Sequence, residues 1–203
     1  MASERRLTAF VGAVEHGNSM FLVTVDAKGA ILDRRGADLT TELSTHPHHH
    51  EGSWAVGRYR DTPWAREISL PDAIELVERV RVAALEGASA LVANLTEDIA
   101  ARIRGIALRA CPDLPPTVEA CIRDHRAQTF ADTVLYRNAM ATAARESKWR
   151  VHWYDKDKVF EEAESILNRD VQQVLKDMGR VIGPPWQARH KLAAAAAISV
   201  SRK

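Results

Sequence analysis

A run of histidines is the most concentrated set of chemically active side chains in the first third of the sequence. The segment THPHHHEG contains His46, His48, His49, His50 and Glu51. Imidazole is a good ligand for Zn²⁺ and Ni²⁺, but adjacent side chains of an extended segment point to opposite sides and cannot all reach one ion. The two cysteines, Cys111 and Cys121, form no CxxC motif that would complete a site. We therefore predict a solvated or substrate-facing loop, with a metal-binding regulator as an alternative.

Several acidic residues stand where a carboxylate is less expected. Glu119 interrupts an apolar run in VEACI, and a buried carboxylate there would need a partner. Glu15 follows the apolar run LTAFVGAV, at the boundary between an expected strand and a turn. Asp124 and His125 come just after VEACI. Exposed acids are common at such boundaries, so each position has a structural as well as a functional interpretation.

Positive charge gathers at the end of the chain, although the formal net charge is only +1. Residues 178–203 contain no acid and five bases: Arg180, Arg189, Lys191, Arg202 and Lys203. This asymmetry indicates an anionic partner, with a solvated tail as the alternative. Two tryptophans of an irregular segment, Trp54 and Trp64, can stack on bases or anchor the core. Trp149, Trp153 and Trp186 are expected to pack in the core or between helices.

Length and composition exclude several classes. With 203 residues and 46% hydrophobic residues, the chain is expected to fold as a single domain over 1–203. No apolar run reaches the roughly 18 residues of a membrane span, and we expect a cytoplasmic protein. There is no GxGxxG, P-loop, HExxH or GxSxG motif to support a dinucleotide, nucleotide-triphosphate, zinc-protease or serine-hydrolase site.

The elements that must position these residues begin with three strands. Residues 7–14, 20–26 and 30–35 are apolar and β-capable, and short turns such as DAKG join them into an antiparallel meander. Residues 36–68 contain Gly, Pro, Ser, Thr, His and Trp without clear periodicity. This length predicts an irregular loop that is functional or mobile.

The rest of the chain is expected to alternate between helices and strands. Ser69 and Pro71 open a helix, and Thr96 opens another at about 97–110. Residues 117–122 (TVEACI) and 150–154 are predicted strands, the first lying beside strand one. Further helices are predicted at 129–147, 158–178 and 187–200, the last packed closely on a sheet through its alanines. Together these elements predict an α/β fold with a mixed sheet flanked by helices.

This order resembles the ribonuclease H-like fold, and within it the RuvC-type Holliday-junction resolvases. The resemblance spans most of the chain outside 36–95. It rests on four segments: AFVGAVEHG, CPDLPPTVEACI, DTVLYRNAMATAARESKWRVHWYDKDKV and RHKLAAAAAI.

The resemblance implies hydrolysis of a phosphodiester by two divalent ions held by carboxylates, at one edge of the sheet. Glu15, Glu119 and His190 are the expected ligands and catalytic residues, and Asp124 or His125 can complete the set. The N-terminus of the last helix would face the phosphate. Arg180, Arg189, Lys191, Trp54 and Trp64 are then expected to contact nucleic acid.

Two positions depart from the family pattern. Glu15 stands where the family has Asp, and Ala193 stands where it has a second carboxylate in the last helix. A site with fewer charges should hold Mg²⁺ weakly and favour Mn²⁺. The leading hypothesis is a RuvC-like protein that binds branched or structured DNA rather than RNA, as a homodimer, and cuts it with Mg²⁺ or Mn²⁺. The alternative is a catalytically decayed module that binds nucleic acid or a protein without cleavage.

Overall fold

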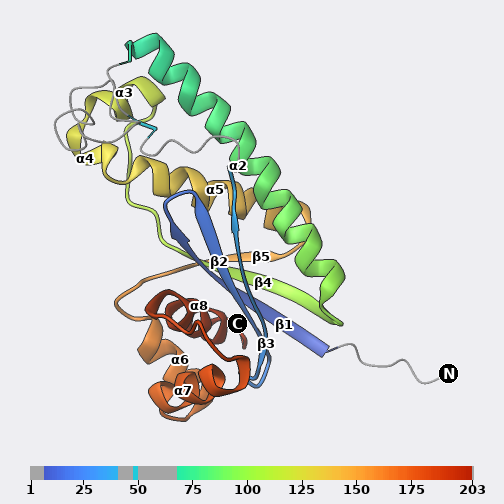
Figure 1. Cartoon of the computed structure of the whole chain (residues 1–203). Helices are drawn as coiled ribbons and strands as arrows, with labels where there is room; N and C mark the ends of the chain where they lie inside the picture. Colours follow the sequence, from blue (N-terminus) through green and yellow to red (C-terminus); the bar gives the residue numbers. More distant parts are fainter. Residues whose placement is uncertain (1–6, 41–47, 50–67, 203) are drawn as a thin grey trace.

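The computed structural model describes residues 7–40, 48–49 and 68–202 (Figure 1). The chain opens with β1 (Leu7–His16), β2 (Ser19–Asp26) and β3 (Ile31–Asp38). These strands pair in sequence order and antiparallel, with Phe10 opposite Val25 and Phe21 opposite Gly36. The predicted meander is confirmed.

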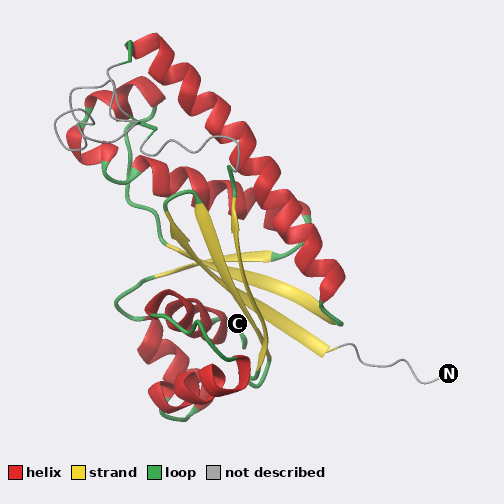
Figure 2. Ribbon diagram, viewed as in Figure 1, coloured by secondary structure: helices red, strands yellow, loops and turns green. Residues whose placement is uncertain are grey.

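Two parallel strands complete the sheet. β4 (Ala101–Arg109) pairs with β1, and β5 (Arg150–Tyr154) pairs with β4. The strand order is β3-β2-β1-β4-β5, which puts the first strand in the middle (Figure 2). This mixed sheet flanked by helices is the ribonuclease H-like arrangement that the sequence predicts.

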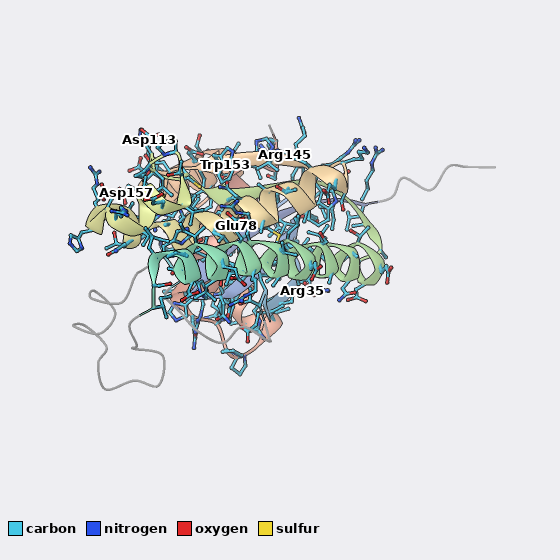
Figure 3. The ribbon with its side chains drawn as sticks, turned by 90° about the horizontal axis from the view of Figure 1, so that it is seen from above. Arg35, Glu78, Asp113, Arg145, Trp153 and Asp157 are labelled. Carbon is cyan, nitrogen blue, oxygen red and sulfur yellow. The ribbon has the colours of Figure 1, made fainter. Side chains whose placement is uncertain are left out.

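Helices cover both faces of the sheet. On one face, α2 (Leu70–Asp98) and α5 (Ala131–Glu146) lie side by side, as Figure 3 shows from above. On the other face lie α6 (Val159–Leu167), α7 (Val171–Ile182) and α8 (Ala188–Ser199). The side chains of β1 alternate between these layers: Val11 packs with α2 and α5, whereas Phe10 packs with α8.

The alanine-rich helix α8 lies very close to β1, as its composition predicts. Residues 193–197, all alanine, are fully buried. At Gly12 of β1, a Cβ atom would lie 1.8 Å from the carbonyl oxygen of Ala193. Small side chains on the helix and a missing one on the strand therefore set the distance between these two layers.

The predicted helix at 97–110 is wrong. Helix α2 continues through Gly87 to Asp98, and the chain then forms β4. Gly87 is accommodated because its Cα faces the backbone of Leu39, which leaves no room for a side chain. In β4, buried Ala101 and Ile103 alternate with exposed arginines, which is the period of a strand.

The predicted strand at 117–122 is also wrong. The side chain of Thr117 accepts a hydrogen bond from the Ala120 N–H (3.1 Å) and begins the short helix α3 (Val118–Arg123). Asp124 caps the next turn, α4 (His125–Gln128), in the same way. The place beside strand one belongs to β4, so the predicted fold holds with a different strand in that position.

The predicted helix at 158–178 is two helices. Asn168 ends α6 in the left-handed conformation, and Asp170 caps α7 through the N–H groups of Gln172 and Gln173. None of the helices in the described part of the chain is long and apolar enough to cross a membrane.

Candidate functional site: the carboxyl edge of the parallel strands

Glu15 lies near the end of β1 and points toward α5. Its carboxylate forms an ion pair with Arg137, and both side chains are less than 10% exposed. Arg137 also donates to the carbonyl oxygen of Ala110 (2.9 Å). Burial lowers the pKa of Arg137, but the hydrogen bond and charge of Glu15 more than offset it, so the pKa is raised overall. The Glu15 carboxylate is thus neutralised within the protein.

Glu119 and Asp124 lie on the α3–α4 segment. Glu119 is exposed and pairs with Arg123 one helical turn away (3.1 Å). The carboxylate of Asp124 accepts from the Ala127 N–H (2.8 Å) as the cap of α4, next to the exposed His125. Both acids make local helix contacts, which account for their presence without a ligand.

His190 is buried in the first turn of α8. Its Nδ1 accepts from the Gln187 N–H (3.0 Å), its ring stacks on Trp186, and it meets Phe21 edge-on. Burial, together with the charges of Arg34 and Arg189, lowers the pKa of His190. The neutral imidazole therefore acts as part of the helix cap.

The structure does not bring Glu15, Glu119 and His190 together. Glu15 bonds to α5 on one face of the sheet, whereas His190 belongs to α8 on the other. The described residues contain no group of three or more His, Cys, Asp or Glu that could hold a metal ion. Ala193 is fully buried against β1. These residues do not fit a pair of divalent cations, and their assignment as ligands stays a prediction that the geometry does not support.

A different site lies where β1, β4 and β5 end. A pocket of about 550 Å³, here called the edge pocket, is lined by Val14, Glu15, His16, Arg109, Tyr154, Lys156, Phe160, Gln187, Ala188, Arg189 and Leu192. The carboxyl ends of parallel strands are where open α/β sheets bind ligands. Here those ends carry Arg109 and Lys156, and α8 contributes Arg189.

The charge balance of the edge pocket is positive. Glu15, the one carboxylate among the described residues that line it, is already paired with Arg137 outside the lining. The amino end of α8, with its exposed Gln187 and Ala188, adds the partial positive charge of a helix N-terminus. A divalent cation is repelled by this arrangement, and an anion is attracted.

Of the basic residues predicted to meet nucleic acid, only Arg189 lines this pocket. Its guanidinium lies over the Phe21 ring, 4.3 Å from the centroid, and its Nε donates to Gln187 (2.8 Å). Lys191 lies two residues further along α8 and is exposed. Arg180 is exposed on α7 and pairs with Asp177 (3.0 Å). Trp54 and Trp64 lie outside the described residues.

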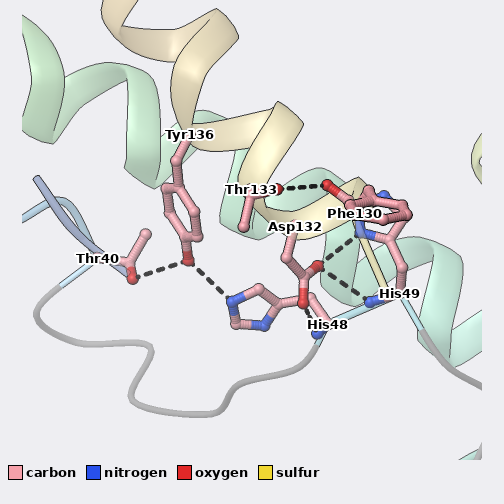
Figure 4. A network of polar contacts seen from close by, with 7 residues as sticks. All are labelled: Thr40, His48, His49, Phe130, Asp132, Thr133 and Tyr136. Carbon is pink, nitrogen blue, oxygen red and sulfur yellow. Dashed lines mark hydrogen bonds and ion pairs between the residues drawn. The ribbon is translucent and has the colours of Figure 1, made fainter. Parts of the chain in front are cut away.

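Two residues of the histidine cluster belong to a buried polar network (Figure 4). Asp132 of α5 accepts from the His48 N–H (2.8 Å) and pairs with Nδ1 of His49 (2.6 Å). Nε2 of His48 lies 2.9 Å from the hydroxyl of Tyr136, which is also 3.4 Å from Oγ1 of Thr40. Burial raises the pKa of Tyr136 to about 12, so this hydroxyl stays protonated.

This network fastens the chain after β3 to α5. His48 and His49 are almost fully buried, so they are not the solvated loop residues that the sequence predicts. His46, His50 and Glu51 lie outside the described residues. In the described contacts, the imidazole of His48 meets Tyr136 and that of His49 meets Asp132, and the two rings do not bond to each other.

Sequence interpretation missed the most important residues of both sites. Arg109 was expected in a helix, although the alternation in ARIRGIALR indicates a strand ending at this residue. Lys156 follows the correctly predicted strand at 150–154. A cation at the end of that strand was a usable signal of an anion-binding site. Nothing in the sequence indicated that Arg137 and Asp132, both on α5, would be the buried partners of Glu15 and His49.

No family model and no curated protein matches the chain. Among solved structures, the RuvC of Thermus thermophilus in complex with a Holliday junction substrate is similar, with a TM-score of 0.49 and 13% identity over 95% of this chain and 91% of that chain. A second Thermus thermophilus RuvC structure gives a TM-score of 0.47 and 13% identity over 94% and 92%. At this identity the similarity concerns the fold alone.

Proposed function

We propose that the protein is a ribonuclease H-like module that binds the phosphate backbone of nucleic acid at the edge pocket and does not cleave it. One observation carries the proposal: Arg109, Lys156 and Arg189 surround the pocket at the carboxyl edge of the parallel strands. A nuclease of this fold, as the resemblance implies, would need a cluster of carboxylates there. The catalytically decayed module, which the sequence analysis gave as the alternative, is therefore better supported than the nuclease.

The lining of the edge pocket suits a nucleotide unit better than a bare anion. Val14, Phe160 and Leu192 give it an apolar wall, while the three cations stand around them. A mostly apolar surface with a few placed charges is typical of sites that bind organic ligands. The cations would contact phosphate, and the apolar wall would contact a sugar or a base.

The proposed polymer is DNA, as expected from the resemblance. The RuvC neighbour was solved with a Holliday junction, which makes a four-way junction the first substrate to test. A homodimer would present two edge pockets to the two halves of such a symmetric substrate. Analytical ultracentrifugation with and without junction DNA tests whether the protein is a dimer. The proposed location of the protein is the cytoplasm.

The central experiment measures fluorescence anisotropy of labelled four-way junction, duplex and single-stranded DNA over a range of salt concentrations. Binding should weaken steeply with salt, and Arg109→Gln with Lys156→Gln should weaken it for every sequence alike. Each lost phosphate contact should flatten the log–log salt slope by about 0.9 on duplex DNA. Arg79→Gln, which removes an exposed cation of α2, is the matched control.

Cleavage is assayed on the same substrates with Mg²⁺ and with Mn²⁺. The expected result is binding without strand scission in either metal. Salt-independent binding, or binding that survives both substitutions, would overturn the edge pocket as the site. Metal-dependent cutting that is lost in Glu119→Gln but kept in Arg79→Gln would restore the nuclease hypothesis.

A further inference from the structure

A second pocket lies beside the edge pocket, over the hairpin of β2 and β3. This pocket, here called the hairpin groove, has a volume of about 470 Å³, and its lining includes Ser19, Phe21, Arg34, Gly36, Asp38 and His190. Across the hairpin, Phe21 pairs with Gly36 and Ser19 pairs with Asp38. Residues that pair directly point to the same face of a sheet, so these positions share one face.

The hairpin groove adjoins the edge pocket across strand β1. Val14 and His16, which line the edge pocket, pair with Phe21 and Ser19, which line the groove. Both pockets therefore use the same face of the sheet. They meet at Arg189, which lines the edge pocket and places its guanidinium 4.3 Å from the centroid of the Phe21 ring.

Arg34 gives the hairpin groove a fixed positive charge. The side chain is half-buried, and its guanidinium donates to the backbone carbonyl oxygens of Gly183 (2.8 Å), Pro184 (3.4 Å) and Pro185. All of these partners are neutral oxygens of the segment between α7 and α8. They hold the guanidinium in place, and no carboxylate among the described contacts of Arg34 neutralises it.

Arg189 is also held by neutral groups. Its Nε donates to the side-chain oxygen of Gln187 (2.8 Å), and its guanidinium lies on the ring of Phe21. Both arginines are close to the buried ring of His190, because burial and then the charges of Arg34 and Arg189 lower the pKa of that imidazole. Two guanidinium groups near one neutral ring repel each other, and an anion between them would relieve the repulsion.

The acids near the hairpin groove do not cancel this charge. Asp38 is the one carboxylate among the described residues that line the groove, and it accepts a hydrogen bond from Ser19. Arg35 also lines the groove, but two carboxylates already pair with it. The C-terminus of α7 supplies about half a negative charge. The charges of Arg34 and Arg189 exceed this sum, so the groove remains positive.

We propose that the hairpin groove is a second phosphate subsite, in which Arg34 and Arg189 hold the nucleic-acid backbone where it leaves the edge pocket. The inference rests on the proposed function, because the same strand must occupy both pockets. The planar forks of two arginines match the oxygens of a phosphate. From Arg109 on β4 to Arg34 on β3 there are three strand spacings of about 4.8 Å, or about 14 Å.

The test uses the full-length protein and fluorescein-labelled oligothymidylates of about 2 and about 8 nucleotides, because about 14 Å corresponds to about four nucleotides at about 3.4 Å each. The shorter one can fill only the edge pocket, whereas the longer one reaches both pockets. Fluorescence anisotropy at several salt concentrations measures the affinity of each. The wild type should bind the longer oligonucleotide more tightly.

Arg34→Gln removes the charge of the new subsite. The variant should lose on the order of tenfold in affinity for the longer oligonucleotide, the scale of one hydrogen bond to a charged group. Its salt slope should fall by about 0.7, the contribution of one single-strand contact. Binding of the shorter oligonucleotide should be unchanged. Arg34→Lys, which keeps the charge without the planar fork, should keep the salt slope and part of the affinity.

Asp38→Asn tests the subsite by a gain of binding, which a damaged fold would not produce. Asparagine keeps an acceptor for the Ser19 hydroxyl but removes an exposed negative charge from the groove. The variant should bind the longer oligonucleotide more tightly than the wild type and the shorter one equally. Arg102→Gln, which removes an exposed cation from the opposite end of β4, is the matched control and should behave as wild type.

Each contrary outcome has one meaning. A length gain that survives Arg34→Gln, or an Asp38→Asn variant that binds no more tightly than the wild type, overturns the hairpin groove while the edge pocket stands. If Arg34→Gln loses both oligonucleotides, the 183–185 segment has moved, and Asp38→Asn alone decides. Displacement of the longer oligonucleotide by polyglutamate at equal charge concentration overturns the subsite in favour of an acidic protein partner. Absence of binding to any nucleic acid overturns the proposed function itself.

Discussion

Arg137 of α5 links the carboxylate of Glu15 on β1 to the carbonyl oxygen of Ala110 just after β4. The guanidinium therefore holds the ends of two neighbouring strands to the helix layer above them. Its bond to Ala110 satisfies a backbone acceptor at the point where the chain leaves the sheet. The acid that the resemblance offers as a metal ligand serves here as the counter-charge of a buried arginine.

Replacing Glu15 should test this role directly. Glu15→Gln leaves the buried Arg137 without a counter-charge, so the free energy of unfolding should fall by about 3–5 kcal/mol. Urea denaturation measures it. The control is Glu119→Gln, whose exposed pair with Arg123 should be worth no more than about 1 kcal/mol. Equal losses in the two variants, or a Glu15→Gln protein as stable as wild type, would contradict the structural role.

The buried pair of His49 and Asp132 should show strong energetic coupling. In a double-mutant cycle of His49→Ala and Asp132→Ala, each single change removes the pair between the two side chains, while Asp132 keeps its bond from the His48 N–H. The coupling energy should fall in the range of about 0.5–3 kcal/mol. The cycle is measured by chemical denaturation at neutral pH.

A cycle of Asp132→Ala with Arg180→Ala provides the control, since Arg180 lies on α7, on the other face of the sheet from α5. Distant sites should add within about 0.5 kcal/mol. If the His49 cycle is as additive as the control, the network of Figure 4 contributes no stability through that pair.

Stability should depend on pH through His190. The pKa of this residue is lowered in the folded protein by burial and by Arg34 and Arg189, whereas the unfolded imidazole binds a proton near its usual value of about 6.5. Below that pH the unfolded state holds more protons, so the free energy of unfolding falls as the pH is lowered. Each unit of pKa difference is worth about 1.4 kcal/mol once the pH is below both values.

His190→Gln separates this contribution from the other histidines. Glutamine keeps a side-chain acceptor for the Gln187 N–H, as in other capping boxes, but does not titrate. Stability measured from about pH 8 to pH 5 should fall less in the variant than in the wild type. Parallel curves for the two proteins would show that His190 titrates equally in both states.

Two glycines of the first hairpin should differ sharply in tolerance. Gly12→Ala puts a Cβ 1.8 Å from the Ala193 carbonyl oxygen, and α8 would have to move away from the sheet. The expected loss is about 3 kcal/mol or more. Gly17→Ala meets no atom within 4 Å and pays only for a positive φ of 59°, about 1–2 kcal/mol. Thermal melting that ranks Gly17→Ala as the worse variant would contradict this close contact.

The sequence predicted the sheet better than the site. Turn residues and apolar runs identify the meander, and the strand at 150–154 was predicted with its observed bounds. The start of β4 was missed because Thr96, Glu97 and Asp98 form a good helix start, and in the structure they continue α2 instead. The alternation of Ala101 and Ile103 with arginines was the better signal, because the burial of one face of the segment determines that it forms a strand.

The site residues were harder to predict because their roles depend on packing between distant segments. Glu15 is as acceptable in a metal site as in an ion pair, and only the position of α5 decides which it joins. Glu119 lies in the six-residue segment TVEACI, which fits a strand or a helix, and Thr117 decided the outcome as a cap. The edge pocket depends on three cations from three separate segments of the chain, and no local sequence pattern indicates that they meet.

The strand order has a consequence for the route by which this chain folds. The pairings among β1, β2 and β3 join neighbouring segments, so they can form early with little loop-closure entropy. The β1–β4 pairing must wait until the chain from Leu39 to Ala100, including all of α2, has been closed into a loop. We expect the rate-limiting step to be the docking of β4 beside β1, with α2 already helical. Changes at that seam should slow refolding, and changes in the β2–β3 turn, which forms before this step, should also slow refolding and leave the unfolding rate nearly unchanged.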